Sequence, residues 1–210
     1  MAVRTKSFLR REQYKELAKL SIDGKILDVG GSKKSGYHEL IGGLHEITTG
    51  NIDESYGTDV IFDAQEPWPF DGNSFDGVLL VNILEHLYHH EKALEEAFRV
   101  LKSGGTLAGV VPFMFNVHAS PHDYFRYTKA ALTNRLADAG FSDIEVRELG
   151  TGAFSVIYHC LIGFARFNWM ADIGIGLARF LDALVLKLKP DNKLSAKQMP
   201  LGYYFEAKKL

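Results

Sequence analysis

Residues 25–32 read Lys-Ile-Leu-Asp-Val-Gly-Gly-Ser. A short apolar run, rich in β-branched side chains and containing one carboxylate, Asp28, ends at the glycine pair Gly30 and Gly31. Such a run, bounded by glycines, is typical of a strand that is covered on both faces. Paired glycines allow a tight turn and a close approach of the backbone to a ligand. We therefore predict a buried strand and a turn that passes beside a binding site.

Strand-like and helix-like patterns alternate along the rest of the chain. Further strands are predicted at 46–52, 59–62, within 73–82, and at 106–111, 141–149 and 202–207. Helical patterns fall at 5–20, 37–41, 93–101, where Gly104 and Gly105 are expected to stop the helix, and 129–139, which Thr128 is expected to cap. This alternation predicts parallel βαβ units and an α/β fold with seven strands.

The link between the second and third strands is unusually short. About six residues separate them, whereas a crossover helix needs roughly a dozen. We therefore predict that a turn around residues 54–57 replaces this helix.

A long apolar segment precedes the last strand. Residues 153–188 are rich in apolar and aromatic side chains but carry five spaced charges, so no stretch reaches the roughly 18 uncharged residues of a spanning helix. We interpret 153–190 as a helical insertion within a single domain, 1–210. It could pack on the core, cover an apolar acceptor, form a dimer face or rest on a membrane surface.

Composition narrows the range of partners. The chain has 210 residues, 46% of them hydrophobic, and can therefore bury a full core. Its formal charge of -2 argues against non-specific binding of nucleic acid. The single cysteine, Cys160, allows no intrachain disulfide, and the first residues form no apolar signal core. These features predict a cytoplasmic protein with a small-molecule partner.

Carboxylates stand at the ends of three predicted strands: Asp28, Asp53 and Asp63. In open α/β sheets ligands bind beyond the carboxyl ends of the strands, and an acid about twenty residues after the glycine turn commonly binds ribose hydroxyls. Asp53 lies near that distance from Gly31. Alternatively, Asp53 could be a solvent-exposed loop residue beside Glu54 that binds no ligand.

The glycine turn departs from the known nucleotide fingerprints. It reads Gly-Gly-Ser-Lys-Lys-Ser-Gly over residues 30–36, which breaks the Gly-x-Gly-x-x-Gly spacing, and the phosphate-binding Gly-x-x-x-x-Gly-Lys-Ser/Thr loop does not occur. The spacing disfavours a nicotinamide-dependent oxidoreductase.

Five motifs in order carry a family resemblance: Ile-Leu-Asp-Val-Gly-Gly at 26–31, Asp-Ala at 63–64, Pro-Phe-Asp-Gly-Asn-Ser-Phe-Asp at 69–76, Leu-Glu-His-Leu at 84–87 and Arg-Val-Leu-Lys-Ser-Gly-Gly at 99–105. This set resembles the class I S-adenosylmethionine-dependent methyltransferases. The resemblance implies a Rossmann-like, doubly wound, mostly parallel sheet with S-adenosylmethionine as cofactor.

The resemblance also implies roles for individual residues. It places the turn of Asp28, Gly30 and Gly31 against the methionine moiety, and Asn82 beside the methionine and the methyl group. Asp53 is implied as the ribose ligand. Asp63 and Ala64 match the positions that flank the adenine.

The segment after the fifth strand, 112–128, combines histidines, carboxylate, arginine and aromatic side chains. Loops at this end of a sheet commonly carry the acceptor site. His118 and His122 have the intrinsic pKa of a general base, and Asp123 could orient one of them.

Two residues of the segment are candidates for binding the acceptor itself. Tyr124 could contact it, and Arg126 could hold an anionic group on it. An internal ion pair between Asp123 and Arg126 is an equally simple alternative. A metal site from His118 and His122 is not expected, because the sequence places no third ligand.

His86 is a further catalytic candidate, although the Glu85-His86 pair could instead brace the edge of the sheet. Together these observations predict a methyltransferase that acts on a small-molecule acceptor. A cofactor-binding scaffold without acceptor chemistry and an NAD-dependent oxidoreductase are the alternatives.

Overall fold

The structure, a computed structural model, describes residues 7–161, 168–189 and 193–210. Parts of the predicted helix 5–20 and of the predicted insertion 153–190 therefore lie outside the described residues.

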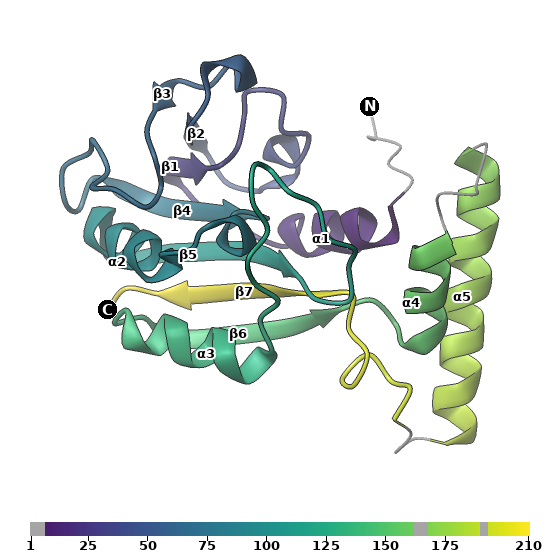
Figure 1. Ribbon diagram of the computed structural model, residues 1–210. Coiled ribbons are helices and arrows are strands. Elements are labelled where there is room, and N and C mark those ends of the chain that lie inside the picture. The colour runs from purple at the N-terminus through teal and green to yellow at the C-terminus, as the bar shows by residue number, and fades with distance from the viewer. Residues whose placement is uncertain (1–6, 162–167, 190–192) are drawn as a thin grey trace.

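Seven strands form one sheet, in the order β3-β2-β1-β4-β5-β7-β6 (Figure 1). They are β1 Gly24–Val29, β2 His45–Asn51, β3 Val60–Ile61, β4 Phe75–Val81, β5 Leu101–Pro112, β6 Ser142–Leu149 and β7 Gly202–Lys208. All neighbouring pairs are parallel except those of β7, which runs antiparallel to both β5 and β6. The predicted α/β fold with a mostly parallel, Rossmann-like sheet of seven strands is thus confirmed.

Helices cover both faces of the sheet (Figure 1). They are α1 Phe8–Leu17, α2 His90–Val100, α3 Lys129–Asp138, α4 Ala153–Leu161 and α5 Asn168–Leu188, with short 3₁₀ turns η1 His38–Leu40, η2 Glu54–Tyr56 and η3 Leu84–His86. Thr128 caps α3 as predicted, because its side chain accepts a hydrogen bond from the Ala131 backbone N–H.

Alternate residues of the central strands pack into two separate hydrophobic cores, one on each face of the sheet. Leu27, Val78 and Leu80 pack with α2 and α3, whereas Ile26 and Leu79 pack on the opposite face with α1 and α5. Because successive side chains of a strand point to opposite faces, both faces must be apolar, as the continuous hydrophobic runs predicted.

One boundary prediction was wrong. Gly104 and Gly105 do not stop α2, because the helix ends at Val100 and β5 begins at Leu101. Leu101 pairs with Phe75 of β4, and a bulge then shifts the register before Thr106. Pairing with a neighbouring strand therefore determines the boundary, and both glycines lie within the irregular start of β5.

The short link between β2 and β3 is a turn, as predicted. It contains η2, which Asp53 caps and which ends at Gly57 in the left-handed conformation. Without a crossover helix, this turn leaves Asp53 exposed at the end of the sheet.

The inserted helices α4 and α5 pack against each other beside the sheet (Figure 1). On α5, the buried face carries Ala171, Ile175 and Ala178. A second apolar row on the same helix is exposed to solvent: Met170, Ile173, Leu177, Phe180 and Leu184. In the part of the chain that the structure describes, no helix combines the length and apolar character needed to cross a membrane.

Candidate functional site

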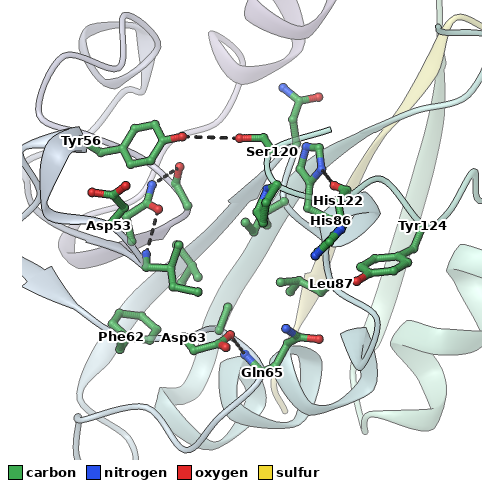
Figure 2. A pocket seen from close by; sticks show the side chains of 18 residues that line it. Asp53, Tyr56, Phe62, Asp63, Gln65, His86, Leu87, Ser120, His122 and Tyr124 are labelled. Carbon is green, nitrogen blue, oxygen red and sulfur yellow. Dashed lines mark hydrogen bonds between the residues drawn. The ribbon is translucent and has the colours of Figure 1, made fainter. Parts of the chain in front are cut away.

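A cavity of about 900 Å³ opens at the carboxyl ends of the parallel strands (Figure 2). It lies where the strand order reverses between β1 and β4, which is the usual ligand site of such sheets. One side, the strand wall, is built from residues that end or follow β1 to β4: Val29, Gly30, Asn51, Ile52, Asp53, Tyr56, Phe62, Asp63, Ala64, Gln65, Asn82 and Ile83. The other side, the loop wall, comes from η3, the residue after it and the segment after β5: His86, Leu87, Ser120, Pro121, His122 and Tyr124.

Eight predicted site residues line this cavity: Gly30, Asp53, Asp63, Ala64, Asn82, His86, His122 and Tyr124. Figure 2 shows Asp53 and Asp63 on one side, across from His122 and Tyr124. The other five predicted site residues are not part of its lining: Asp28, Gly31, His118, Asp123 and Arg126.

The turn after β1 needs both glycines. Gly30 has a φ of 82°, and a Cβ there would come within 2.8 Å of the Ile83 side chain. A Cβ on Gly31 would lie 1.8 Å from the Asp28 carboxylate. Only glycine fits at both positions, so the turn backbone borders the cavity without side chains.

Asp28 supports this turn from its buried side. Its side chain is fully buried and accepts a hydrogen bond of 2.8 Å from the Tyr37 hydroxyl, while His38 Nε2 lies 2.6 Å away. Burial, and next the charge of Asp28, raise the pKa of Tyr37, so its hydroxyl stays a donor. Asp28 therefore fixes the glycine turn and presents no carboxylate to the cavity.

Asp53 and Asp63 are held by turns of their own. Asp53 Oδ1 accepts a hydrogen bond of 2.7 Å from the Ser55 N–H, which lowers the pKa of this exposed carboxyl. Asp63 Oδ1 accepts one of 2.9 Å from the Gln65 N–H. Both side chains are thereby oriented along the strand wall as acceptors for hydroxyl and amine groups.

The segment that carries the loop wall is tied to η3 by backbone hydrogen bonds. The carbonyl of Glu85 accepts from the N–H groups of Tyr124, at 2.8 Å, and Phe125, at 3.3 Å. The Tyr127 hydroxyl donates to the Leu84 carbonyl at 3.1 Å. These contacts join the ends of two neighbouring strands, β4 and β5, so the loop wall has a defined position.

Asp123 and Arg126 form the internal ion pair that was the alternative to an acceptor role. Arg126 donates to both carboxylate oxygens at 2.5 and 2.7 Å, and Asp123 also accepts from the His118 N–H at 2.8 Å. The Arg126 guanidinium lowers the pKa of Asp123 to about 2. This pair lies outside the cavity and stiffens the segment that bears His118 and His122.

The comparison with protein families gives one match. A family model described as a methyltransferase domain matches residues 46–109, which run from β2 into β5 and include most of the strand wall. The fold, the glycine turn and the acid after β2 agree with this match. Over these residues the chain is similar to methyltransferase domains. A search of curated protein sequences gave no significant match.

Several solved structures share the fold of this chain. A possible histamine N-methyltransferase from Thermotoga maritima is 16% identical, with a TM-score of 0.61, covering 99% of this chain and 92% of the other. Phosphoethanolamine N-methyltransferase 2 from Haemonchus contortus, solved with S-adenosyl-L-methionine, is also 16% identical, with a TM-score of 0.56 and 94% of this chain covered. The match spans only 52% of the Haemonchus protein, about half its length.

The same fold also serves another reaction. The [4+2]-cyclase SpnF is 19% identical, with a TM-score of 0.57, and the match covers 94% of this chain and 79% of that protein. At such low identities these structures establish the shared fold, and the acceptor chemistry must be argued from the cavity itself.

Sequence reasoning missed two polar supports of the cavity. The Asn51 amide donates to the carbonyls of Gly30 and Gly31 at 3.0 and 3.2 Å and so holds the glycine turn. Gln13 of α1 donates to Asn82 at 2.7 Å. Gln13 lies four residues from Leu9 and from Leu17, so a polar residue inside the apolar stripe of α1 was the available signal.

Glu85 was also missed, although it lies next to His86. Its side chain is fully buried, and neither of its carboxylate oxygens has a hydrogen-bond partner. Burial raises the pKa of Glu85 to about 8. His86 Nε2 and His118 Nε2 each lie 3.8 Å from Glu85 Oε1, so two imidazoles and a carboxyl group lie together at the edge of the loop wall.

Proposed function

We propose that this methyltransferase transfers a methyl group from S-adenosylmethionine to a small-molecule acceptor. The single observation that carries the proposal is a cavity with two unlike walls. The strand wall offers a bare glycine turn and two oriented carboxylates, and the loop wall offers two histidines and a tyrosine. A volume of about 900 Å³ is near the upper end of small-molecule sites and leaves room for two ligands.

The strand wall fits the cofactor. The Gly30 backbone would border its methionine end, Asp53 would accept from the ribose hydroxyls, and Asp63 would accept from the adenine amine. Asn82 lies at the end of β4, where Gln13 fixes its amide. S-adenosylmethionine supplies the methyl group from its sulfonium.

The loop wall fits the acceptor. In-line methyl transfer requires alignment of the acceptor and, for a hydroxyl or amine, removal of a proton. His86 Nδ1 donates to the His122 carbonyl at 2.6 Å, which orients the His86 ring. His122, which lines the cavity, is the candidate to accept the acceptor's proton. His122 and Tyr124 line the same wall and would position the acceptor.

Calorimetry and a turnover assay test this proposal. We expect binding of S-adenosylmethionine and of its demethylated product, S-adenosylhomocysteine, but not of NAD. Binding of NAD alone would favour the oxidoreductase alternative. Cofactor binding without methylated product across a broad acceptor panel would favour a non-catalytic scaffold.

The exposed apolar row on α5 supports the expected contact of the inserted helices with a second copy or a membrane surface. No described residue of 153–188 lines the cavity, so the row gives no support to a role as a lid. The cytoplasm stays the predicted compartment.

A further inference from the structure

We propose that Glu85, His86 and His118 form a binding site for one divalent transition-metal ion at the edge of the loop wall. Each residue offers one ligand atom, and the three atoms lie within 4.8 Å of one another. Two residues come from η3 after β4 and the third from the segment after β5, so the cluster spans two neighbouring strand ends.

Both imidazoles present the correct nitrogen. His86 Nδ1 lies 2.6 Å from the His122 carbonyl, and His118 Nδ1 lies 3.3 Å from the Asn116 carbonyl. A carbonyl oxygen only accepts, so each Nδ1 must carry the proton and each Nε2 must be bare in the neutral ring. Metal-binding histidines characteristically donate their other N–H to a carbonyl or carboxylate in this way.

Glu85 supplies the third ligand and the charge. A fully buried carboxyl group with two unpaired oxygens is costly unless a partner compensates it. Arg126, the nearby cation, is already engaged in two hydrogen bonds to Asp123. A metal ion between Glu85 and the two Nε2 atoms would satisfy a group that the protein itself leaves without a partner.

The spacing is close to that of an occupied site. Bonds of about 2.1 Å in tetrahedral geometry separate ligand atoms by about 3.4 Å. The Glu85 oxygen lies 3.8 Å from each Nε2, and the three ligand atoms lie within 4.8 Å of one another, so each ligand needs to move by less than about 1 Å. Two imidazoles and one carboxylate favour zinc, iron or manganese over magnesium or calcium.

Three protein ligands leave at least one coordination position for water or for another oxygen ligand. His86 lines the cavity, so an ion beside it would be within reach of an acceptor that carries a hydroxyl or carboxylate. The proposed ligand of the open position is therefore an oxygen atom of the acceptor.

Metal binding can be tested without cofactor, acceptor or turnover, so it is independent of the proposed function. The full chain, without an affinity tag and stripped with a chelator, is titrated with Zn²⁺ against a chromophoric chelator. We expect one equivalent to bind, and the variants Glu85→Gln, His86→Gln and His118→Gln to bind about 100-fold more weakly or worse. Magnesium at millimolar concentration should not compete.

The matched control is His89→Gln, because His89 is an exposed histidine beside a carboxylate, Glu91, outside the cluster. It should bind Zn²⁺ like the wild type. Thermal melts without metal check that each variant folds, and Zn²⁺ should raise the melting temperature of the wild type but not of the three ligand variants. A wild type that takes up no Zn²⁺, or folded ligand variants that bind it with unchanged affinity, would overturn the proposal.

Discussion

The two walls of the cavity differ in how their side chains are held. On the strand wall, Asp53 and Asp63 are each fixed by a backbone N–H two residues further along the chain. On the loop wall, the His86 ring contacts the carbonyl of a residue 36 positions away, and the backbone carbonyl of Glu85, next to it, accepts from the N–H groups of Tyr124 and Phe125. One wall depends on local turns and the other on contacts that only the folded sheet creates.

Under the proposed function, this difference separates binding of the cofactor from reaction of the acceptor. A change on the strand wall should alter cofactor affinity, whereas a change behind the loop wall should alter turnover at unchanged cofactor affinity. The predictions below test that separation, from the largest effect to the smallest.

Gly31→Ala should have the largest effect. The new Cβ would lie 1.8 Å from an Asp28 oxygen that Tyr37 and His38 hold in place. We expect a loss of roughly 2–3 kcal/mol in the free energy of unfolding, measured with denaturant, and no measurable cofactor binding. Gly176→Ala is the control, because a Cβ there meets nothing within 4 Å and alanine favours the helix. Equal free energies of unfolding for the two variants would contradict the proposed clash of a Cβ at position 31 with Asp28.

Asp53→Ala should weaken S-adenosylmethionine binding by about 10- to 100-fold, because hydrogen bonds to an ionised carboxylate are roughly twice as strong as neutral ones. His118→Ala should leave this affinity nearly unchanged and slow turnover instead, because His118 does not line the cavity's strand wall. Calorimetry on both variants provides the comparison. Equal losses of affinity would refute the assignment of Asp53 to the ribose, and an unchanged rate in His118→Ala would remove it from the catalytic residues.

Asp123→Ala should slow turnover about tenfold while cofactor affinity stays constant. The change removes the acceptor of the His118 N–H and leaves the Arg126 guanidinium without its carboxylate. The segment that carries the loop wall then loses its main internal tie. Steady-state kinetics with calorimetry measures both quantities, and Asp138→Ala, at an exposed position at the end of α3, serves as control. A parallel loss of cofactor affinity would show that the walls are not separable.

Phe180→Glu should have the smallest effect on catalysis, less than twofold, because none of the α5 side chains that the structure describes lines the cavity. Its side chain is 63% exposed in the apolar row of α5. If this row joins two copies of the chain, light scattering should show a dimer in the wild type and a monomer in the variant. A monomeric wild type that sediments with lipid vesicles would identify a membrane surface instead.

The fold followed from the sequence because its signals are periodic and local. Apolar runs, glycine turns and the Thr128 cap predicted most of the strands and helices. The start of β5 was missed because pairing with β4 draws Leu101 and the residues after it into the sheet. A helix-stop pattern depends only on nearby residues, so it does not predict where a residue pairs with a neighbouring strand.

The site residues also differ in whether local sequence was enough to predict them. Asp53 and Asp63 were predicted from their positions after strands, and both line the cavity. The third carboxylate, Asp28, faces the turn from its buried side, because Tyr37 and His38 approach it there. Residues that act through distant partners, such as Glu85, could not be assigned from spacing alone, since their surroundings come from segments more than thirty positions away.

The position of β7 has a consequence for synthesis of the chain. This strand is the last of the seven in order of translation, yet it lies between β5 and β6 and pairs with both. Until residues 202–208 leave the ribosome, β5 presents an unpaired edge and β6 has no neighbour. Nascent chains must therefore keep the apolar edge of β5 from aggregating until residues 202–208 are made, and the sheet is completed only then.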